Sequence, residues 1–163
     1  MKTIFESKRL LVIENDGWEY VERKNAKEAV AVIAETKDGE LILTEQRRKS
    51  LNARVIDFPA GLVEHEDPEK AAIRELEEET GYTCDSVKFL VKGPSAPGVT
   101  SEIVSIYVAR GVRRVGDGGG VGSEQITVHR VPLQELSAWL RQQNALVDLK
   151  LAIYARNTIF PKC

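Results

Sequence analysis

The stretch EDPEKAAIRELEEETGY, residues 66–82, carries its own helix boundaries. Asp67 suits the N-cap, Pro68 suits the first helical position, and Gly81 suits the left-handed position just beyond the last turn. These residues predict a helix over 68–80. Four glutamates crowd into its second half, at positions 75 and 77–79. Like charges at helical spacing destabilise a helix by about a few tenths of a kcal/mol per pair, so this crowding needs a reason.

Most of these glutamates fall on one face of the predicted helix. Each residue advances by about 100° around the axis, so with Glu75 at zero, Glu79 lies near about +40° and Glu78 near about −60°. Glu77 points roughly the opposite way, toward solvent. Apolar residues on the adjoining arc would face the core: Ala72, Ile73 and Leu76. Glu78 and Glu79 also stand in the last turn, where the helix dipole disfavours negative charge.

Two interpretations of this acidic face remain open from the residues alone. It is either a solvated surface with an ion pair between Arg74 and Glu78, or it faces something strongly positive. Hard divalent cations such as Mg²⁺ prefer carboxylate and carbonyl oxygens. The preceding turn FPAG, residues 58–61, would deliver a backbone carbonyl beside the helix face. The carbonyl expected beside the helix favours the interpretation that the acidic face meets something strongly positive.

The rest of the chain is rich in strand patterns. RLLVIE and WEYVERK flank Asp16–Gly17, which predicts a hairpin of two strands over residues 4–24. The apolar run AVAVIAET, residues 29–36, is typical of a strand buried on both faces. VGDGGGVGSE, residues 115–124, must be a loop because glycine at that density stabilises neither helix nor strand. Further strands are expected within residues 40–46, 50–57, 86–93, 102–112 and 125–133.

Residues 132–159 have helical spacing of their leucines, so the chain reads as mostly strands with two helical regions. This pattern predicts an α+β sandwich. We expect a single main domain over residues 26–163, preceded by the hairpin in residues 1–25.

Composition excludes several classes of function. The 163 residues carry a formal net charge of −2, which lacks the basic footprint of a nucleic-acid-binding protein. No apolar run approaches the twenty residues of a membrane span, and the first residues lack a signal-peptide pattern. Cys84 and Cys163 are too few for a disulfide framework. A cytoplasmic protein is the expectation.

Residues 61–82 resemble the Nudix box, G-x5-E-x7-R-E-U-x-E-E-x-G-U, in which U is an aliphatic or bulky residue. The residues that match in register are Glu66, Arg74, Glu75, Leu76, Glu78, Glu79, Gly81 and Tyr82. One departure is that four residues, not five, separate Gly61 from Glu66. Because the missing residue falls in the loop, the helix register is kept, and the roles of Gly61 and Glu66 are the ones put in question.

Segments along nearly the whole chain are similar to the ADP-ribose pyrophosphatase and nucleoside-diphosphate-sugar hydrolase branch of that family. They are GWEYVERKNAKEAVAVIA, LTEQRR, DFPAGL, SAPGVTSEIVSIYVA and GSEQITVHRVPL. The resemblance implies a Nudix α/β/α sandwich with a mixed sheet and an N-terminal β-hairpin extension. It also implies hydrolysis of the diphosphate linkage of ADP-ribose or an NDP-sugar, giving NMP and a sugar phosphate, with Mg²⁺ or Mn²⁺.

The resemblance implies roles for particular residues. The carbonyl of Ala60 with Glu75 and Glu79 would hold the metal, and Glu78 would assist. Residues that would contact substrate are Trp18, Glu19, Arg23, Arg48 and Glu102. Asp57 stands where the branch usually has glutamate. The catalytic base is expected at Glu124, after the glycine-rich loop, with Glu78 or Glu66 as the alternative.

Other functions compete with this interpretation. One is a nucleoside triphosphate sanitising enzyme, which would need no N-terminal hairpin. Another is a non-catalytic nucleotide sensor, in which eroded helix carboxylates would be expected. A homodimer is expected, in which the hairpin contributes Trp18 and Arg23 to the partner's pocket. No nucleic-acid or membrane partner is expected.

Overall fold

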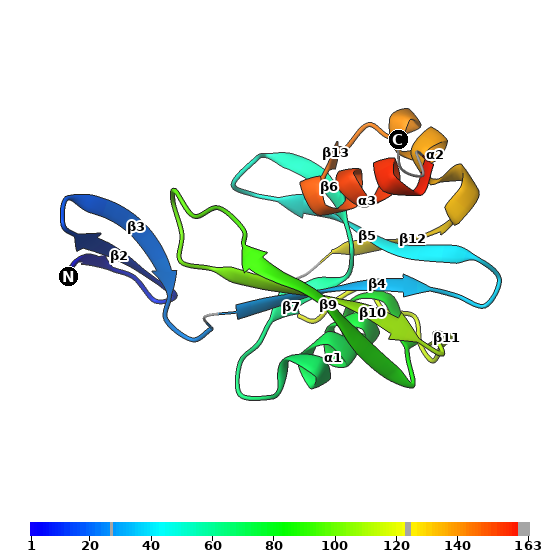
Figure 1. The fold of residues 1–163 in the computed structure, drawn as a ribbon, viewed down its shortest axis with the longest axis horizontal. Helices are drawn as coiled ribbons and strands as arrows, with labels where there is room; N and C mark the ends of the chain where they lie inside the picture. Colours follow the sequence, from blue (N-terminus) through cyan, green and yellow to red (C-terminus); the bar gives the residue numbers. More distant parts are fainter. Residues whose placement is uncertain (27, 123–124, 160–163) are drawn as a thin grey trace.

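The computed structural model describes residues 1–26, 28–122 and 125–159 (Figure 1). The strands are β1 (Lys2–Glu6), β2 (Leu10–Asn15), β3 (Trp18–Arg23), β4 (Glu28–Glu35), β5 (Glu40–Arg48), β6 (Ala53–Asp57), β7 (Ala60–Leu62), β8 (Tyr82–Thr83), β9 (Ser86–Pro94), β10 (Ile103–Arg110), β11 (Arg113–Arg114), β12 (Ile126–Pro132) and β13 (Leu146–Val147). The helices are α1 (Pro68–Thr80), the 3₁₀ turn η1 (Leu133–Glu135), α2 (Leu136–Gln142) and α3 (Leu149–Ile159).

The central sheet is mixed, with strand order β13-β6-β5-β4-β10-β9. Strand β12 pairs with β5, and β7 pairs with the first half of β4. Strands β4 and β10 run parallel, as do β6 and β13, while the other pairs are antiparallel. Pairing with β7 places the turn before Ala60 at the middle of the sheet.

Strand β4 explains the layered arrangement. Its side chains alternate between two cores, because successive residues of a strand point to opposite faces. Val30 and Val32 pack with Ala72 and Leu76 of α1 in one core. Ala31 and Ile33 pack with Leu151 of α3 in the other. The expectation of a strand buried on both faces is therefore confirmed.

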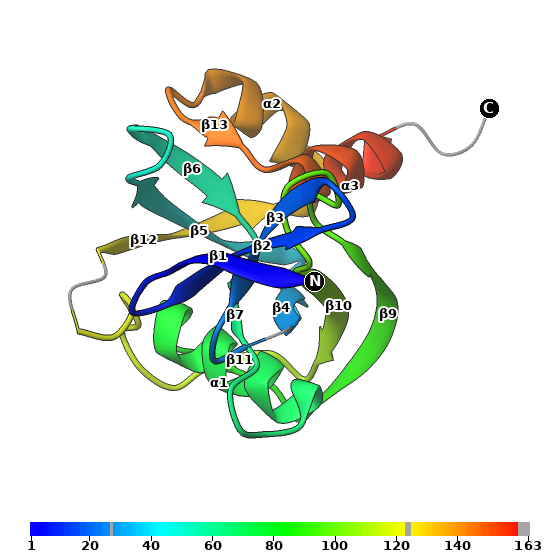
Figure 2. The ribbon, with the colours of Figure 1, turned by 90° about the vertical axis from the view of Figure 1, so that its left-hand side faces the viewer.

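The two cores place helices on opposite sides of the sheet. Figure 1 shows α1 on one face and α2 with α3 on the other, and the turned view in Figure 2 shows the same separation. The predicted α/β/α sandwich with a mixed sheet is confirmed. Within the described ranges, no helix is long and apolar enough to cross a membrane.

The C-terminal region is not one helical stretch, as its spacing predicted. Residues 146 and 147 leave the helix and form β13, which pairs in parallel with Val55 and Ile56 of β6. The backbone N–H of Asp148 then donates to the carbonyl of Ile56 at 2.9 Å. The edge of β6 offers hydrogen bonds that compete with helix continuation. Tertiary pairing therefore divides the region into η1, α2 and α3.

The N-terminal region also differs from its prediction. It has three strands and not two, because residues 2–6 add β1 to the outer edge of β2. The turn at Asp16 and Gly17 is as expected, with φ of 53° and 80° in the left-handed region that such turns require. The three-stranded sheet projects from one end of the molecule (Figure 1). It is anchored by hydrogen bonds of Val21 with Val99 and Ser101, at 2.8 and 3.2 Å.

Candidate active site

The site is built where the turn before β7 meets the last turns of α1. Helix α1 begins after Asp67 and ends at Gly81, whose φ is 72° and whose N–H donates to the carbonyl of Glu77. Both ends are as predicted, although the Asp67 side chain makes no capping hydrogen bond. Glu77 is exposed, also as predicted, while Glu79 is only 5% exposed.

Glu79 is tied to the turn by a hydrogen bond. The backbone N–H of Ala60 donates to its Oε2 at 3.0 Å, and Gln46 Nε2 of β5 lies 3.5 Å from its Oε1. Two predicted metal ligands, Ala60 and Glu79, therefore lie in contact. Gln46 was missed by the sequence analysis, although it stands in the segment LTEQRR that was compared with the family.

Glu75 packs against the next residue of β7. A Cβ built on Gly61 would lie 2.0–2.2 Å from the three carboxyl atoms of Glu75, which is far inside contact distance. Only glycine leaves room for the carboxylate at this place. Gly61 thus contacts Glu75, even though one residue is missing between it and Glu66.

Arg74 gathers the remaining carboxylates. Its guanidinium lies 2.8 Å from Glu66, 2.8 Å from Glu75 and 3.0 Å from Glu78. It also donates to the carbonyl of Leu62 at 3.1 Å. Burial would lower the pKa of Arg74, but these carboxylates outweigh it and raise that pKa above its ordinary value. The cation offsets repulsion among the glutamates, and Glu66 reaches it despite the shortened loop.

The arrangement supplies the ligands of a hard divalent cation in part. Among the described residues, no three His, Cys, Asp or Glu side chains are grouped closely enough to hold a metal ion. The carboxylates of Glu75 and Glu79 nevertheless lie against two consecutive residues of β7. Two carboxylates beside a backbone turn are donors of the type that Mg²⁺ prefers. The chemistry of these oxygen donors therefore fits a hard divalent cation, although fewer than three such side chains are grouped among the described residues.

The glycine-rich loop caps the end of α1. The N–H groups of Gly119 and Gly120 donate to the carbonyls of Glu79 and Glu78 at 2.9 and 3.0 Å. These are carbonyls that a helix end leaves without intrahelical partners. Beyond the loop, Ile126 pairs with Gln46 in the sheet. The predicted base, Glu124, lies outside the described residues.

Of the five predicted substrate residues, two contact each other and the other three are exposed. Arg23 and Glu102 contact each other, with Arg23 Nε 2.7 Å from Glu102 Oε2, and Ser95 donates to Glu102 at 3.1 Å. Trp18 and Glu19 lie exposed on β3. Arg48 lies exposed at the end of β5. Within the described part of the chain, no hydrogen bond or ion pair joins any of these five side chains to the glutamates of α1.

His129 has a partner that the sequence did not indicate. Its Nε2 lies 2.7 Å from Glu45 Oε2, and its ring meets Trp139 edge-on with centroids 4.9 Å apart. Arg54 also binds Glu45. Burial would raise the pKa of Glu45, but hydrogen bonds from Arg54 and His129 outweigh this and lower it. This network joins β5, β6 and β12.

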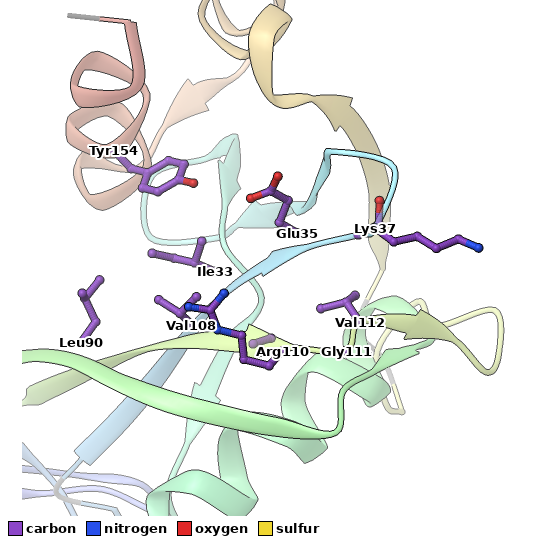
Figure 3. Close-up of a pocket in the computed structure, with 11 residues that line it drawn as sticks. Ile33, Glu35, Lys37, Leu90, Val108, Arg110, Gly111, Val112 and Tyr154 are labelled. Atoms are coloured by element: carbon purple, nitrogen blue, oxygen red, sulfur yellow. The ribbon is translucent and has the colours of Figure 1, made fainter. Parts of the chain in front are cut away.

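A cavity of about 540 Å³ lies away from these carboxylates. Figure 3 shows it between Tyr154 of α3 and the ends of β4 and β10, with Glu35, Lys37 and Arg110 at its border. Its lining includes none of the predicted site residues. This cavity therefore does not coincide with the candidate active site. A separate hollow of about 400 Å³ lies on α1 and is lined in part by Arg74 and Glu78.

The chain is similar to known proteins over most of its length. The family profile described as the NUDIX domain matches residues 25–151. The chain is 35% identical over 127 residues to the methanol dehydrogenase activator of Bacillus methanolicus, covering 77% of this chain and 68% of that protein. It is 44% identical over 82 residues to the ADP-ribose pyrophosphatase of Bacillus subtilis strain 168, covering 50% of this chain and 44% of that protein.

A second pyrophosphatase and a solved structure also match. The GDP-mannose pyrophosphatase of Cronobacter sakazakii is 31% identical over 90 residues, with 54% of this chain and 47% of that protein covered. The matched segments thus span less than half the length of these two pyrophosphatases. A crystal structure described as an ADP compounds hydrolase superposes with a TM-score of 0.73 at 24% identity, covering 97% of this chain and 88% of that one. This structural similarity, at 24% identity, supports the fold alone.

Proposed function

Because this chain belongs to the Nudix family, we propose that it hydrolyses the diphosphate linkage of a nucleoside diphosphate compound, either ADP-ribose or an NDP-sugar. The products would be NMP and a sugar phosphate. The observation that carries the proposal is the seating of Glu75 and Glu79 on Gly61 and Ala60. The printed names of the pyrophosphatase relatives support the substrate class.

The proposed cofactor is Mg²⁺, with Mn²⁺ as a possible replacement. Glu75, Glu79 and the carbonyl of Ala60 would hold it, with Glu78 assisting. When bound, such an ion neutralises diphosphate charge and makes water more acidic. The contacts of these carboxylates with Arg74, Ala60 and Gly61 support the proposal, because they restrain the side chains.

The residues of this chain have separate tasks in the proposed reaction. Arg48 would contact the diphosphate. Glu124 would accept a proton from the attacking water as the new P–O bond forms, and the bond from phosphorus to the bridging oxygen would break. Of the residues that the structure describes near it, Gly119 donates its N–H to the carbonyl of Glu79, and Ile126 pairs with Gln46. Positioning and electrostatics would supply most of the acceleration.

We also propose a homodimer in which residues 1–25 serve dimerisation and substrate contact, while residues 26–163 form the catalytic domain. The N-terminal sheet exposes several large apolar side chains, as an interaction surface does: Met1, Ile4, Phe5, Leu10 and Trp18. Trp18, Glu19, Arg23 and Glu102 would contact substrate. A cytoplasmic location is proposed, and the buried free thiol of Cys84 is compatible with it.

The test is a hydrolysis screen with and without Mg²⁺. For the diphosphate diesters, alkaline phosphatase is added to release phosphate from the monoester products, because it does not act on the intact diester. Nucleoside triphosphates, which alkaline phosphatase attacks directly, are followed without it by the release of pyrophosphate. ADP-ribose, ADP-glucose, GDP-mannose, dinucleotides and nucleoside triphosphates form the panel. Turnover of a diphosphate diester that requires the metal is expected. Turnover of triphosphates alone would favour the sanitising function, and binding without any turnover would favour a sensor.

The assignment of the base has its own test. Glu124→Gln should depress kcat strongly and change KM and the magnesium requirement little, because the residue acts in the transition state. Asp117→Asn is the matched control, since Asp117 is an exposed carboxylate on the same loop. If Glu124→Gln costs less than about tenfold while Glu78→Gln abolishes turnover, the base belongs to the helix.

A further inference from the structure

Asp148 and helix α3, which begins one residue later, contact the three residues that lead into the active-site turn. The backbone N–H of Asp148 donates to the carbonyl of Ile56 at 2.9 Å. Lys150 Nζ lies 3.1 Å from Asp57 Oδ2. One turn later, the ring of Tyr154 meets Phe58 edge-on, with centroids 5.5 Å apart. Contacts from Asp148 and α3 thus cover consecutive residues directly before Pro59.

The charged contact is the unusual one. Asp57 is 8% exposed, and Lys150 also lies 2.6 Å from Asp148 Oδ1. Burial works to lower the pKa of Lys150, but Asp57 and Asp148 outweigh it and raise that pKa above its ordinary value. Burial raises the pKa of Asp57 in spite of Lys150, so the lysine compensates only in part for the burial of this carboxylate. Ion pairs removed from water contribute little net stability compared with apolar packing. Net stability therefore does not account for this pair.

Asp57 passes the restraint on to the turn. Its other oxygen, Oδ1, accepts the backbone N–H of Phe58 at 2.8 Å. The carbonyl of Pro59 then accepts the N–H of Val32 at 2.9 Å, and the N–H of Ala60 donates to Glu79 at 3.0 Å. A continuous set of contacts therefore runs from α3, through residues 57–60, to the carboxylate of α1.

We propose that Lys150 is a positioning residue, which holds Asp57 so that the turn presents Ala60 and Gly61 correctly to Glu79 and Glu75. The inference rests on the proposed function, because it concerns the same site. It assigns α3, which lies on the opposite face of the sheet from α1 (Figure 1), a part in setting the geometry of the reaction.

The first test needs neither metal nor substrate. Amide hydrogen exchange, followed by NMR on the full chain, reports the hydrogen bonds of Phe58 and Ala60 directly. Lys150→Met should accelerate exchange at both amides by about tenfold or more relative to the core amide of Ile42, and Lys150→Arg should restore much of the protection. Unchanged exchange, or a rise shared equally by Ile42, would overturn the proposal.

Two further variants separate positioning from simple loosening of α3. Leu151→Val weakens the packing of a fully buried residue of the same helix and leaves the ion pair in place. It should lower Tm without selective exchange at Phe58 and Ala60. If it produces the same selective exchange, Lys150 has no special part.

A double variant guards against a failure to fold. Asp57→Asn with Lys150→Met removes both charges, so neither is left buried alone. It should fold, yet show fast exchange at Ala60. Restored protection in the double variant would mean that Lys150 only neutralises Asp57, and would overturn the positioning role.

Kinetics completes the test where turnover is found. Lys150→Met should lower kcat by at least about tenfold and raise the magnesium concentration needed for half-maximal rate, while KM for substrate changes little. A change confined to KM for substrate contradicts the proposal. If the wild type hydrolyses none of the diphosphate compounds, the proposed function fails, while the exchange data still decide whether Lys150 positions the turn.

Discussion

At the scale of single residues, the burial of Glu79 is the feature that most needs a function. Burying a carboxylate is costly unless hydrogen bonds or a cation compensate. The N–H of Ala60 supplies part of this compensation, with Gln46 nearby. An acidic side chain so placed, in the disfavoured last turn of a helix, is typical of a site that uses the charge.

Glu79→Gln should therefore separate function from folding. Glutamine keeps an oxygen that can accept the N–H of Ala60, so the fold should persist with Tm shifted by only a few degrees. Turnover should fall on the order of a hundredfold or more, because a ligand charge is lost. Kinetics over a magnesium titration and a thermal melt measure the two effects.

Glu77→Gln is the matched control, because Glu77 is exposed on the opposite side of the same helix. It should leave turnover unchanged. Near-wild-type turnover of Glu79→Gln at saturating magnesium would contradict the metal-site assignment.

Gly61→Ala tests the same site from the side of the turn. The added methyl group would occupy the place of the Glu75 carboxyl group, which is the flexible end of a side chain and can move away. We expect a small loss of stability but a large loss of turnover. Gly93→Ala is the control, since nothing lies within 4 Å of the corresponding Cβ. Equal effects of both substitutions on turnover would refute this role of Gly61.

At the scale of elements, the end of α1 and the glycine-rich loop form one unit. Gly81 bonds through its carbonyl to the N–H groups of Val115 and Gly116, at 2.8 and 3.0 Å. The loop approaches so closely that a Cβ on Gly118 would lie 2.3–2.6 Å from backbone atoms of Thr80 and Gly81. Backbone atoms cannot turn away as a side chain can. The sequence indicated a loop here but not its contact with the helix.

Gly118→Ala should break this unit. Its φ of +66° alone makes alanine unfavourable by about 1–2 kcal/mol, and the clash adds to that cost. Gly122→Ala has nearly the same φ, +70°, but no atom of the described residues lies within 4 Å of its Cβ. Chemical denaturation should show a greater loss of stability for Gly118→Ala. Equal losses would mean that the loop does not depend on this contact.

At the scale of the whole molecule, the N-terminal sheet projects from the rest of the chain (Figure 1). Several of its apolar residues are exposed, among them Phe5 and Trp18, although Ile13 is buried. It joins the rest of the chain through Val21 and the ion pair of Arg23 with Glu102. A three-stranded sheet with little covering is a surface that a second copy could bury. The proposed dimer would place Trp18 and Arg23 in the partner's pocket.

Mixing two inactive variants tests the shared site. A Glu79→Gln chain is combined with a chain carrying Trp18→Ala and Arg23→Ala, after subunit exchange. Activity should recover in the mixture, because one pocket of the mixed dimer receives both intact halves. A chain that elutes as a monomer at working concentration, or mixtures that never exceed the sum of their parents, would exclude the shared site.

The sequence by itself determined the features that depend on neighbours along the chain. The boundaries of α1 follow from Pro68 and Gly81, and the acidic face follows from helical periodicity. The burial of β4 on both faces follows from its continuous apolar run. Such signals act within a few residues, so local patterns record them well.

Tertiary structure decided the contacts between distant residues. Lys150 and Asp57 are 93 positions apart, and Arg23 and Glu102 are 79 positions apart. The division of the C-terminal region by β13 and the added strand β1 also depend on free strand edges elsewhere in the fold. No local pattern records which edge or which carboxylate will be near. The folded sheet brings α3 to the residues before Pro59 and α1 to the residues after it.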